Sequence, residues 1–277
     1  MRLTVLGSGS TGNAILIHAG STRVLVDAGL SARELVRRLV GVGEDPSRLD
    51  GIIVTHEHGD HAGGLRVLLN SVRCPVFISA ATRDAYIRER KNLSSEEPAR
   101  RERILRDRTE EITSSHDFKI GEIDFHPFTV PHDAADNFGF IASHAGTRVA
   151  TVADLGHITT LVREHLRSCA CVVIESNHCR DMLKACTVYP WELKQRIMSR
   201  TGHLSNDDIA AWLADAAEGF DGAASTIVLT HLSQRANNPY VARIVAEDAL
   251  RSRGSLFAPQ TEVVISHPKE PTAWIEL

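Results

Sequence analysis

Four side chains that commonly bind metal ions stand within six positions of this sequence, directly after a short apolar segment, Gly51–Thr55. They are His56, His58, Asp60 and His61. The apolar segment predicts a buried strand, and histidines two positions apart on extended backbone project the same way, so that one metal ion can bind both. Asp60 and His61 stand at the turn into a predicted helix and can face a second ion. The chain must therefore fold so that the end of a buried strand opens onto a metal site.

The remaining apolar patterns predict strands in two groups, each of which ends in helices. The strands are expected over 3–6, 14–18, 23–27, 51–55, 75–79, at intervals through 118–151, and over 170–174, 226–230 and 262–265. The helices are expected over 31–40, 62–71, 80–90, 158–167, 178–184, 190–200, 205–217 and 239–250. Strands and helices do not alternate regularly, which favours two sheets packed face to face with helices outside. We predict an α/β (α+β) fold, a four-layer αββα sandwich, in one domain over residues 1–277.

The composition allows a substantial core and leaves the kind of substrate open. Hydrophobic residues make up 43% of the chain, and the formal charge of −4 neither requires nor excludes nucleic acid, because a local basic groove can lie on a mildly acidic protein. The five cysteines show no paired CxxC motif and indicate reduced thiols. The first residues carry no apolar signal segment, and no apolar run approaches 18 residues. A cytoplasmic protein is expected.

Residues 91–109 are highly charged and almost without apolar side chains. They include five arginines, Arg100, Arg101, Arg103, Arg106 and Arg108. Two interpretations fit this composition: a solvated helix or loop, or a basic arm that contacts a polyanionic substrate.

Further potential ligands follow in an order that resembles the metallo-β-lactamase superfamily. The motif His56-x-His58-x-Asp60-His61 is its signature, and the other members of the pattern are Asp27, His132, Asp154 and His231. The resemblance covers residues 3–265. It implies one metal ion bound by His56, His58 and His132, and a second bound by Asp60, His61 and His231, with Asp154 as a bridge. These ligands suit two divalent ions, Zn²⁺ first, with Mn²⁺ or Fe as alternatives. Asp27 is expected to orient the His/Asp loop through hydrogen bonds.

Motifs in the second half of the chain are similar to the YycJ/WalJ group of this superfamily, whose members are described as DNA exonucleases. They are Glu175-Ser-Asn-His178, Tyr189-Pro-Trp-Glu-Leu-Lys194, Gly202-His-Leu-Ser-Asn206 and His231-Leu-Ser followed by Asn237-Asn238-Pro. The same region is more loosely similar to RNase Z, in which a histidine of a His-Ser-Thr loop aids phosphodiester cleavage. His203 matches that histidine by position, although His-Leu-Ser replaces His-Ser-Thr here. A chain of 277 residues has no room for the β-CASP insertion of RNase J.

The resemblance implies a binuclear metal-dependent phosphodiesterase that acts on nucleic acid, with DNA favoured over RNA, and more specifically a 5′-directed DNA exonuclease. A hydroxide that bridges the two metal ions would attack phosphorus, because bound metal ions lower the pKa of water. His203 would stabilise the phosphoryl oxygens or protonate the leaving oxygen, and Glu175 would orient His203 and raise its pKa. The predicted catalytic residues are Asp60, His203 and Glu175.

A second set of polar residues lies in the loops, where turn formation explains them as well as substrate binding does. Ser8, Ser10, Asn13, Asn237 and Asn238 are candidates to hydrogen-bond phosphate.

Other functions fit parts of the pattern. A thioesterase or lactonase of the glyoxalase II type uses the same metal core on an acyl carbon, and an RNase Z-like endonuclease or a cyclic-nucleotide phosphodiesterase uses it on other phosphodiesters. The His203 motif and the arginine-rich segment favour phosphate over an acyl substrate, which needs neither. A non-catalytic binding protein is disfavoured by the complete ligand set.

Overall fold

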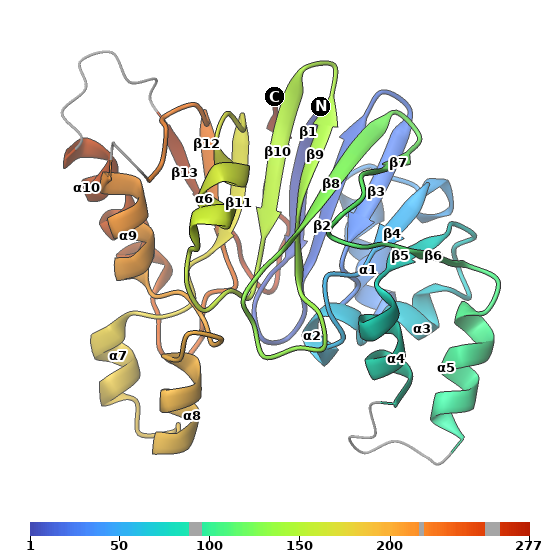
Figure 1. The fold of residues 1–277 in the computed structure, drawn as a ribbon, viewed down its shortest axis with the longest axis horizontal. Coiled ribbons are helices and arrows are strands. Elements are labelled where there is room, and N and C mark those ends of the chain that lie inside the picture. Colours follow the sequence, from blue (N-terminus) through green and yellow to red (C-terminus); the bar gives the residue numbers. More distant parts are fainter. Residues whose placement is uncertain (89–95, 216–218, 253–260) are drawn as a thin grey trace. The chain divides into compact units, whose positions relative to one another are not determined.

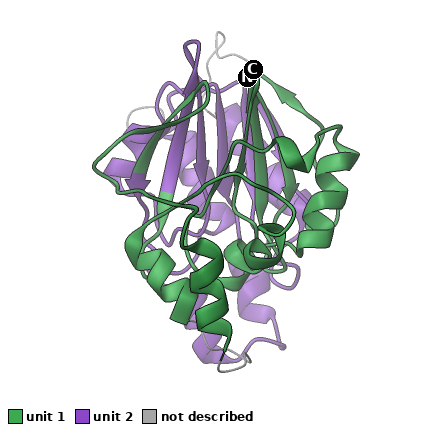
Figure 2. Cartoon of the chain, turned by 90° about the vertical axis from the view of Figure 1, so that its right-hand side faces the viewer, with its two compact units in different colours: residues 1–127, 134–138, 268–276 green, residues 128–133, 139–267, 277 purple. Residues whose placement is uncertain are grey.

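The computed structural model describes residues 1–88, 96–215, 219–252 and 261–277, and these residues form two compact units. Unit 1 consists of residues 1–127, 134–138 and 268–276, and unit 2 consists of residues 128–133, 139–267 and 277 (Figure 2). The chain therefore passes from one unit to the other more than once, at 127–128 and again around 134–138.

Unit 1 contains a sheet in the order β14-β1-β2-β3-β4-β5-β6 (Figure 1). Its strands are β1 (Arg2–Gly7), β2 (Ala14–Ala19), β3 (Thr22–Val26), β4 (Gly51–Ile53), β5 (Val76–Ile78), β6 (Thr109–Glu111) and β14 (Ile275–Glu276). β1, β2 and β3 pair antiparallel, whereas β3 to β6 pair parallel. The helical segments are α1 (Ala32–Gly41), η1 (Pro46–Arg48), α2 (Gly59–Ala62), α3 (Leu65–Leu68), α4 (Ala80–Arg88) and α5 (Glu97–Leu105). Ser31 caps α1 as its sequence predicts, by accepting a hydrogen bond from the backbone N–H of Glu34.

Unit 2 repeats this pattern of antiparallel strands followed by parallel ones. In unit 2 the strand order is β13-β12-β11-β10-β9, with β9 and β10 antiparallel and β10 to β13 parallel. These strands are β9 (Phe138–His144), β10 (Thr147–Val152), β11 (Cys171–Glu175), β12 (Thr226–Thr230) and β13 (Glu262–Ile265). The strand β7 (Phe118–Ile120) and residues 123–127 of β8 (Ile123–Thr129) belong to unit 1, and β7 pairs antiparallel with β8. The helices are α6 (Thr160–Leu166), α7 (Arg180–Ala185), α8 (Trp191–Ile197), α9 (Asn206–Ala214) and α10 (Pro239–Ser252). Each parallel connection in this unit contains at least one helix, as a crossover between parallel strands requires.

Each unit has its own apolar core between its sheet and its helices. In unit 1, Leu25 and Ile52 of the sheet pack in one cluster with Leu35 and Leu39, which lie one turn apart on α1. In unit 2, Val172 and Ile174 of β11 alternate with residues of the opposite face and pack in one cluster with Trp212 and Leu213 of α9. Burying each such side chain contributes about 1.5–3 kcal/mol, so these clusters hold the strand ends in place.

The secondary structure confirms the predicted mixed α/β fold with two sheets, and one predicted helix is wrong. Residues 62–71 were expected as a single helix, but α2 ends at Ala62 and α3 begins at Leu65. The N–H of Gly64 donates to the carbonyl of Ala28, and the carbonyl of Asp60, its partner in a continuous helix, accepts from Asn13 instead. Tertiary hydrogen bonds therefore replace the helical one and fix the loop that carries the His/Asp motif.

Smaller differences lie at the ends of elements. The strands β6 and β14 are not apparent from the sequence, because neither has an apolar pattern long enough to indicate a strand. The charged segment forms α5, in agreement with its interpretation as a helix, while residues 89–95 lie outside the described residues. Within the described ranges, no helix combines the length and the hydropathy needed to cross a membrane.

Candidate metal centre

Most of the predicted ligands and the residues that orient them lie at or just after the ends of strands, where parallel strands commonly carry sites, whereas His203 lies between α8 and α9. In unit 1 these strands are β3 and β4. In unit 2 they are β10, β11 and β12, together with the end of β8, whose last two residues belong to that unit. Asp27, Asp154 and His231 have φ angles of 65°, 53° and 55°. A side chain in this left-handed region is uncommon, and it persists only where surrounding bonds enforce it. Both units therefore accept local backbone strain at the positions that carry these polar groups.

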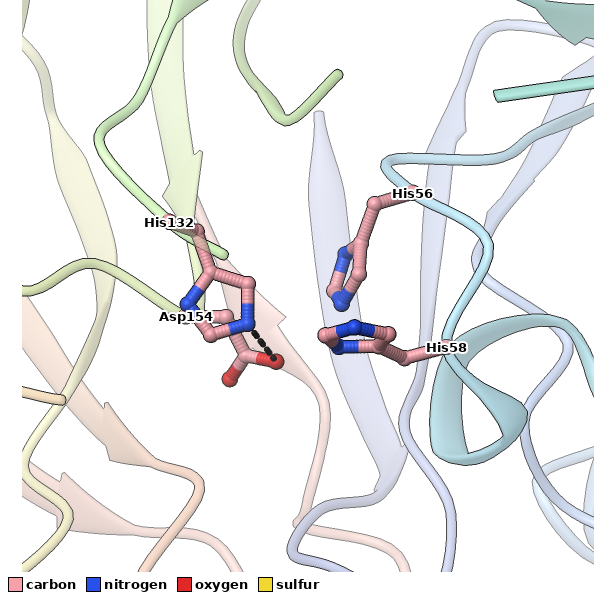
Figure 3. A group of neighbouring side chains, drawn as sticks. All are labelled: His56, His58, His132 and Asp154. Atoms are coloured by element: carbon pink, nitrogen blue, oxygen red, sulfur yellow. Dashed lines mark ion pairs between the residues drawn. The ribbon is translucent and has the colours of Figure 1, made fainter. Parts of the chain in front are cut away.

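The His/Asp motif of unit 1 brings three imidazole rings together. The ring centroid of His56 lies 4.7 Å from that of His58 and 4.1 Å from that of His61. Figure 3 shows the rings of His56 and His58, which come from the same loop after β4. A carboxylate oxygen of Asp60 lies 3.8 Å from Nε2 of His61. Nitrogen and oxygen donors gathered in this way are a fitting set for a divalent transition metal ion.

Asp27 fixes the orientation of this loop, as predicted. One of its carboxylate oxygens accepts a hydrogen bond from the backbone N–H of Thr55 (2.9 Å), and the other lies 2.7 Å from Nδ1 of His61. The hydroxyl of Thr55 donates to the same carboxylate, so its oxygen is left to accept from Nδ1 of His56 at 3.0 Å. Both rings therefore carry their proton on Nδ1 and keep the lone pair on Nε2, the usual arrangement of a metal-binding histidine.

Unit 2 brings four acidic and imidazole side chains together. Donor atoms of Asp154, Glu175, His203 and His231 all lie within 4.8 Å of one another. Nδ1 of His231 lies 2.9 Å from a carboxylate oxygen of Asp154 and 2.8 Å from one of Glu175. Because the ring proton that Nδ1 donates is on that atom, Nε2 of His231 keeps its lone pair.

His132 belongs to the same unit. Figure 3 marks the contact between its Nε2 and a carboxylate oxygen of Asp154, which lie 3.7 Å apart. Nδ1 of His132 lies 3.2 Å from the carbonyl oxygen of Gly202, to which only a protonated nitrogen can donate. Burial lowers the pKa of His132 despite the charge of Asp154, so its Nε2 remains an unprotonated donor atom.

Glu175 holds two histidines at once. One of its oxygens lies 2.7 Å from Nδ1 of His203 and 2.8 Å from Nδ1 of His231, and the other accepts from the backbone N–H groups of Leu155 and Leu204. The carboxylate is fully buried, and burial would raise its pKa, but the charge of His203 and the hydrogen bonds from both rings lower it. Burial would likewise lower the pKa of His203, but the charge and hydrogen bond of Glu175 and the charge of Asp154 raise it. The pair therefore favours a charged imidazolium next to a carboxylate.

A buried polar network joins the three loops that carry Glu175, His203 and His231. The amide of Asn237 donates to the backbone oxygens of Ser176 and Asn177 and to the side chain of Asn206, which also accepts from the hydroxyl of Ser176 at 2.8 Å. The amide of Asn177 donates to the backbone oxygen of His231 at 2.9 Å. Because nearly every polar atom of this network has a partner inside the protein, it fixes the loops relative to one another.

These contacts also explain most of the loop residues that the sequence offered as phosphate ligands. The side chain of Asn237 is used within the network, and that of Asn238 accepts from the backbone N–H of Tyr240 at the start of α10. The hydroxyl of Ser8 donates to Asn13, whose amide lies 2.9 Å from Nε2 of His61. Ser10 is exposed. The turn-forming interpretation therefore accounts for Asn237, Asn238, Ser8 and Asn13.

The sequence did not reveal Thr55 or the network around Ser176 and Asn206. Thr55 stands between the apolar strand and His56, and Ser176 follows a wholly buried strand. A polar residue in such a position must find a hydrogen-bond partner, which is the signal that could have identified both.

The arginines of the charged segment divide into two kinds. Arg101 is buried, lies over the ring of Tyr86 at 4.4 Å and donates to its backbone oxygen, while Arg108 donates to the carbonyls of Leu69 and Val72. The side chains of Arg101 and Arg108 therefore stabilise unit 1. Arg103 and Arg106 are exposed, and Arg106 lines a cavity of about 370 Å³ between α4 and α5.

Comparisons with known proteins agree with this geometry. The β-lactamase superfamily domain matches residues 22–232 of the chain. The chain is 31% identical to the exodeoxyribonuclease YycJ of Bacillus anthracis over 273 residues, which is 98% of this chain and 97% of that protein. The chain belongs to the metallo-β-lactamase superfamily.

Within this superfamily the chain is YycJ/WalJ-like. It is 29% identical to the exodeoxyribonuclease WalJ of Streptococcus pneumoniae over 236 residues, 85% of this chain and 83% of that protein. The crystal structure of the metallo-β-lactamase fold protein YhfI from Bacillus subtilis superposes with a TM-score of 0.68 at 17% identity, over 98% of both chains, which supports the fold alone. The chain is a metal-dependent hydrolase of this fold, and the predicted family and fold are confirmed.

Proposed function

We propose that the protein is a binuclear metal-dependent phosphodiesterase that hydrolyses nucleic acid, in particular a DNA exonuclease that degrades from the 5′ end. The observation that carries this proposal is the His203–Glu175 pair. It lies against Asp154 and His231 but is outside the ligand set expected from the family. A second ionisable group next to a metal-ligand set provides what hydrolysis of a phosphodiester needs beyond the metal ions, namely a proton for the leaving oxygen.

The proposed ligand set is the one that the family implies. His56, His58 and His132 would hold one divalent ion, Asp60, His61 and His231 would hold the other, and Asp154 would be shared. The support within each unit is the donor chemistry: Nε2 lone pairs on the histidines and carboxylate oxygens on the aspartates, held by Asp27, Glu175 and the carbonyl of Gly202. Zn²⁺ suits these donors, and Mn²⁺ is the second candidate. Bound there, the ions would act as Lewis acids on the phosphoryl group and would lower the pKa of water.

Three side chains have the remaining proposed roles in catalysis. Asp60 is a ligand candidate with a partly exposed carboxylate, and we propose that it also holds the attacking water by a hydrogen bond. His203 is positioned by Glu175 through Nδ1, so Nε2 is the atom that can donate a proton to a phosphoryl or leaving oxygen. Since Glu175 and Asp154 raise the pKa of His203, the ring is more readily protonated near neutral pH than an ordinary histidine.

The substrate class comes from the relatives. The two proteins named exodeoxyribonuclease cover most of this chain, and nucleic acid is therefore the proposed substrate, with DNA favoured over RNA. We also propose that the two units function as one domain in the cytoplasm, as expected from the sequence.

The proposal is tested with metal-loaded protein against four substrates: 5′-phosphorylated duplex DNA, single-stranded RNA, bis-p-nitrophenyl phosphate and a thioester. We expect hydrolysis of both DNA and the small diester, with mononucleotides released from the 5′ end of DNA. Preferential cleavage of RNA would support an RNase Z-like activity, and preferential cleavage of the thioester would replace the proposal by one of the glyoxalase II type.

A further inference from the structure

The helix pair α7–α8 of unit 2 exposes large apolar side chains close to His203. Trp191, at the start of α8, is 58% exposed, and Val188, in the connection before it, is 65% exposed. Figure 1 shows α7 and α8 together at the lower end of unit 2, below α9. An exposed tryptophan leaves a large flat apolar surface in water, which is unfavourable unless the surface has a partner.

The pair is held rigidly from beneath. Leu183 of α7 and Ile197 of α8 form a small apolar cluster with Ala236, and Tyr189 packs against it. The hydroxyl of Tyr189 lies 3.4 Å from that of Ser233, two residues after His231. These contacts fix the position of α8, and Trp191 at its start is held in place with it.

The same helix leads directly to the proposed catalytic histidine. The backbone N–H of His203 donates to the carbonyl of Ile197, the last residue of α8, at 2.9 Å. α8 has seven residues and is about 10 Å long at 1.5 Å per residue. A strand that passes His203 thus needs to extend over only one or two nucleotides to reach Trp191, since extended nucleotides span several ångströms each.

The charge of this region suits a polyanion. Residues 180–200 contain five basic and two acidic side chains, a net charge of +3, on a chain whose formal charge is −4. Arg180 and Arg196 form ion pairs with Asp208 and Asp133. Arg200 instead donates to Nε2 of His157, whose Nδ1 donates to the backbone oxygen of Arg200. Within the described ranges Arg200 has no carboxylate partner, so its charge is available to a phosphate.

We propose that α7–α8 binds the single-stranded end of a nucleic-acid substrate, with one base stacked on Trp191 and a backbone phosphate at Arg200. Stacking on an aromatic ring accepts any base, because every base has a π face. The surface would therefore contribute affinity without sequence specificity. This inference rests on the proposed phosphodiesterase function and adds to it the path of the strand.

The first test compares Trp191→Ala with Trp191→Phe and with a control, Tyr240→Ala, which removes a ring that is 70% exposed at the start of α10 and outside α7–α8. Loss of one stacked base costs about 1–3 kcal/mol, so Trp191→Ala should raise KM for a single-stranded oligonucleotide roughly 5- to 150-fold. Trp191→Phe should retain most of the affinity, and Tyr240→Ala should have no effect. None of the three should change kcat/KM for bis-p-nitrophenyl phosphate, which is too short to reach α8.

A second test uses tryptophan fluorescence with a phosphorothioate oligonucleotide that resists cleavage. Trp212 is buried and Trp274 is half-buried, so quenching should come mainly from Trp191 and should be lost in Trp191→Phe. Arg200→Gln should lower the salt dependence of binding by about one counterion, and Arg200→Lys should restore it.

The outcomes separate the two proposals. If the unaltered protein hydrolyses neither the small diester nor nucleic acid, the proposed function fails. If it hydrolyses both and Trp191→Ala behaves like Tyr240→Ala, the strand-binding role of α7–α8 is wrong. Sedimentation of a dimer that Trp191→Ala converts to a monomer, with KM unchanged, would show instead that the surface joins two copies of the chain.

Discussion

The two units present their metal-binding side chains in different ways. In unit 1, the candidates lie in one short segment from His56 to His61, which is the loop after β4 and the start of α2, and their positions follow from these few residues. In unit 2, the candidates follow three strands and lie between His132 and His231, about one hundred positions apart. A contiguous motif needs only a strand end and a tight turn. A dispersed set needs a means of holding separate loops in register, and Glu175 and the network around Asn237 provide it.

The largest effect that tests this comparison is the loss of a ligand from either unit. If His58 and His132 bind the same ion, His58→Ala and His132→Ala should each lower the metal content from two ions per chain to one. Elemental analysis of reconstituted protein measures this. Turnover on DNA should fall by about 10³-fold or more, because the Lewis acid contributes several kcal/mol to stabilising the transition state. A His132→Ala variant that keeps two ions and full activity would confine the ligands of that ion to the local motif of unit 1.

The next effect concerns His203, which belongs to the dispersed set but is not an expected ligand. His203→Ala should fold, retain both metal ions and lose roughly 10²-fold in turnover on phosphodiesters, because a general acid contributes about 10²–10⁴-fold. Bis-p-nitrophenyl phosphate, whose leaving group needs little protonation, should be affected less than DNA. Loss of metal from the variant would make His203 a ligand, and full activity on DNA would leave it a residue that only flanks α9.

Removing the amide that joins the loops of unit 2 should have a smaller effect on catalysis. Asn237→Ala leaves buried partners at Ser176 and Asn206 unsatisfied, which should lower the free energy of unfolding by about 1–3 kcal/mol. The misplaced loops should lower kcat on DNA by about tenfold with little change in KM. Chemical denaturation and steady-state kinetics measure the two changes.

The neighbouring amide provides the control for this variant. Asn238→Ala removes only a side-chain cap at the start of α10 and should cost about 0.5–2 kcal/mol without changing kcat. Equal kcat values for the two variants would mean that the network serves stability alone.

The smallest effect is expected in the arginine-rich segment of unit 1. Neutralising the exposed pair with Arg103→Gln and Arg106→Gln should weaken binding of long DNA only a few-fold, and should lower the salt slope by at most about two. Arg101→Gln, by contrast, should reduce stability, because it removes the contacts with Tyr86. Binding titrations over a range of salt concentrations check the first variant and thermal unfolding checks the second. An unchanged salt slope would leave this segment a solvated surface.

The sequence alone was sufficient wherever the chemistry is local or ordered along the chain. The strand before His56, the His/Asp motif and the cap at Ser31 depend on residues a few positions apart, and the order of Asp27, His132, Asp154 and His231 indicated the superfamily. The pairing of Glu175 with His203 was also predictable, because both lie in motifs of one group of relatives.

The tertiary structure decided what depends on hydrogen bonds between distant segments. Asn13 takes the carbonyl of Asp60 that would otherwise continue a helix, so the predicted helix over 62–71 is divided. The side-chain amide of Asn237 donates to the backbone oxygen of Ser176. The sequence alone does not show whether such an amide binds the protein or a phosphate. Arg101 is buried against Tyr86 while Arg103 faces water. A polar side chain has the same donors wherever it stands, and only the folded chain determines whether its partner is the protein itself or a substrate.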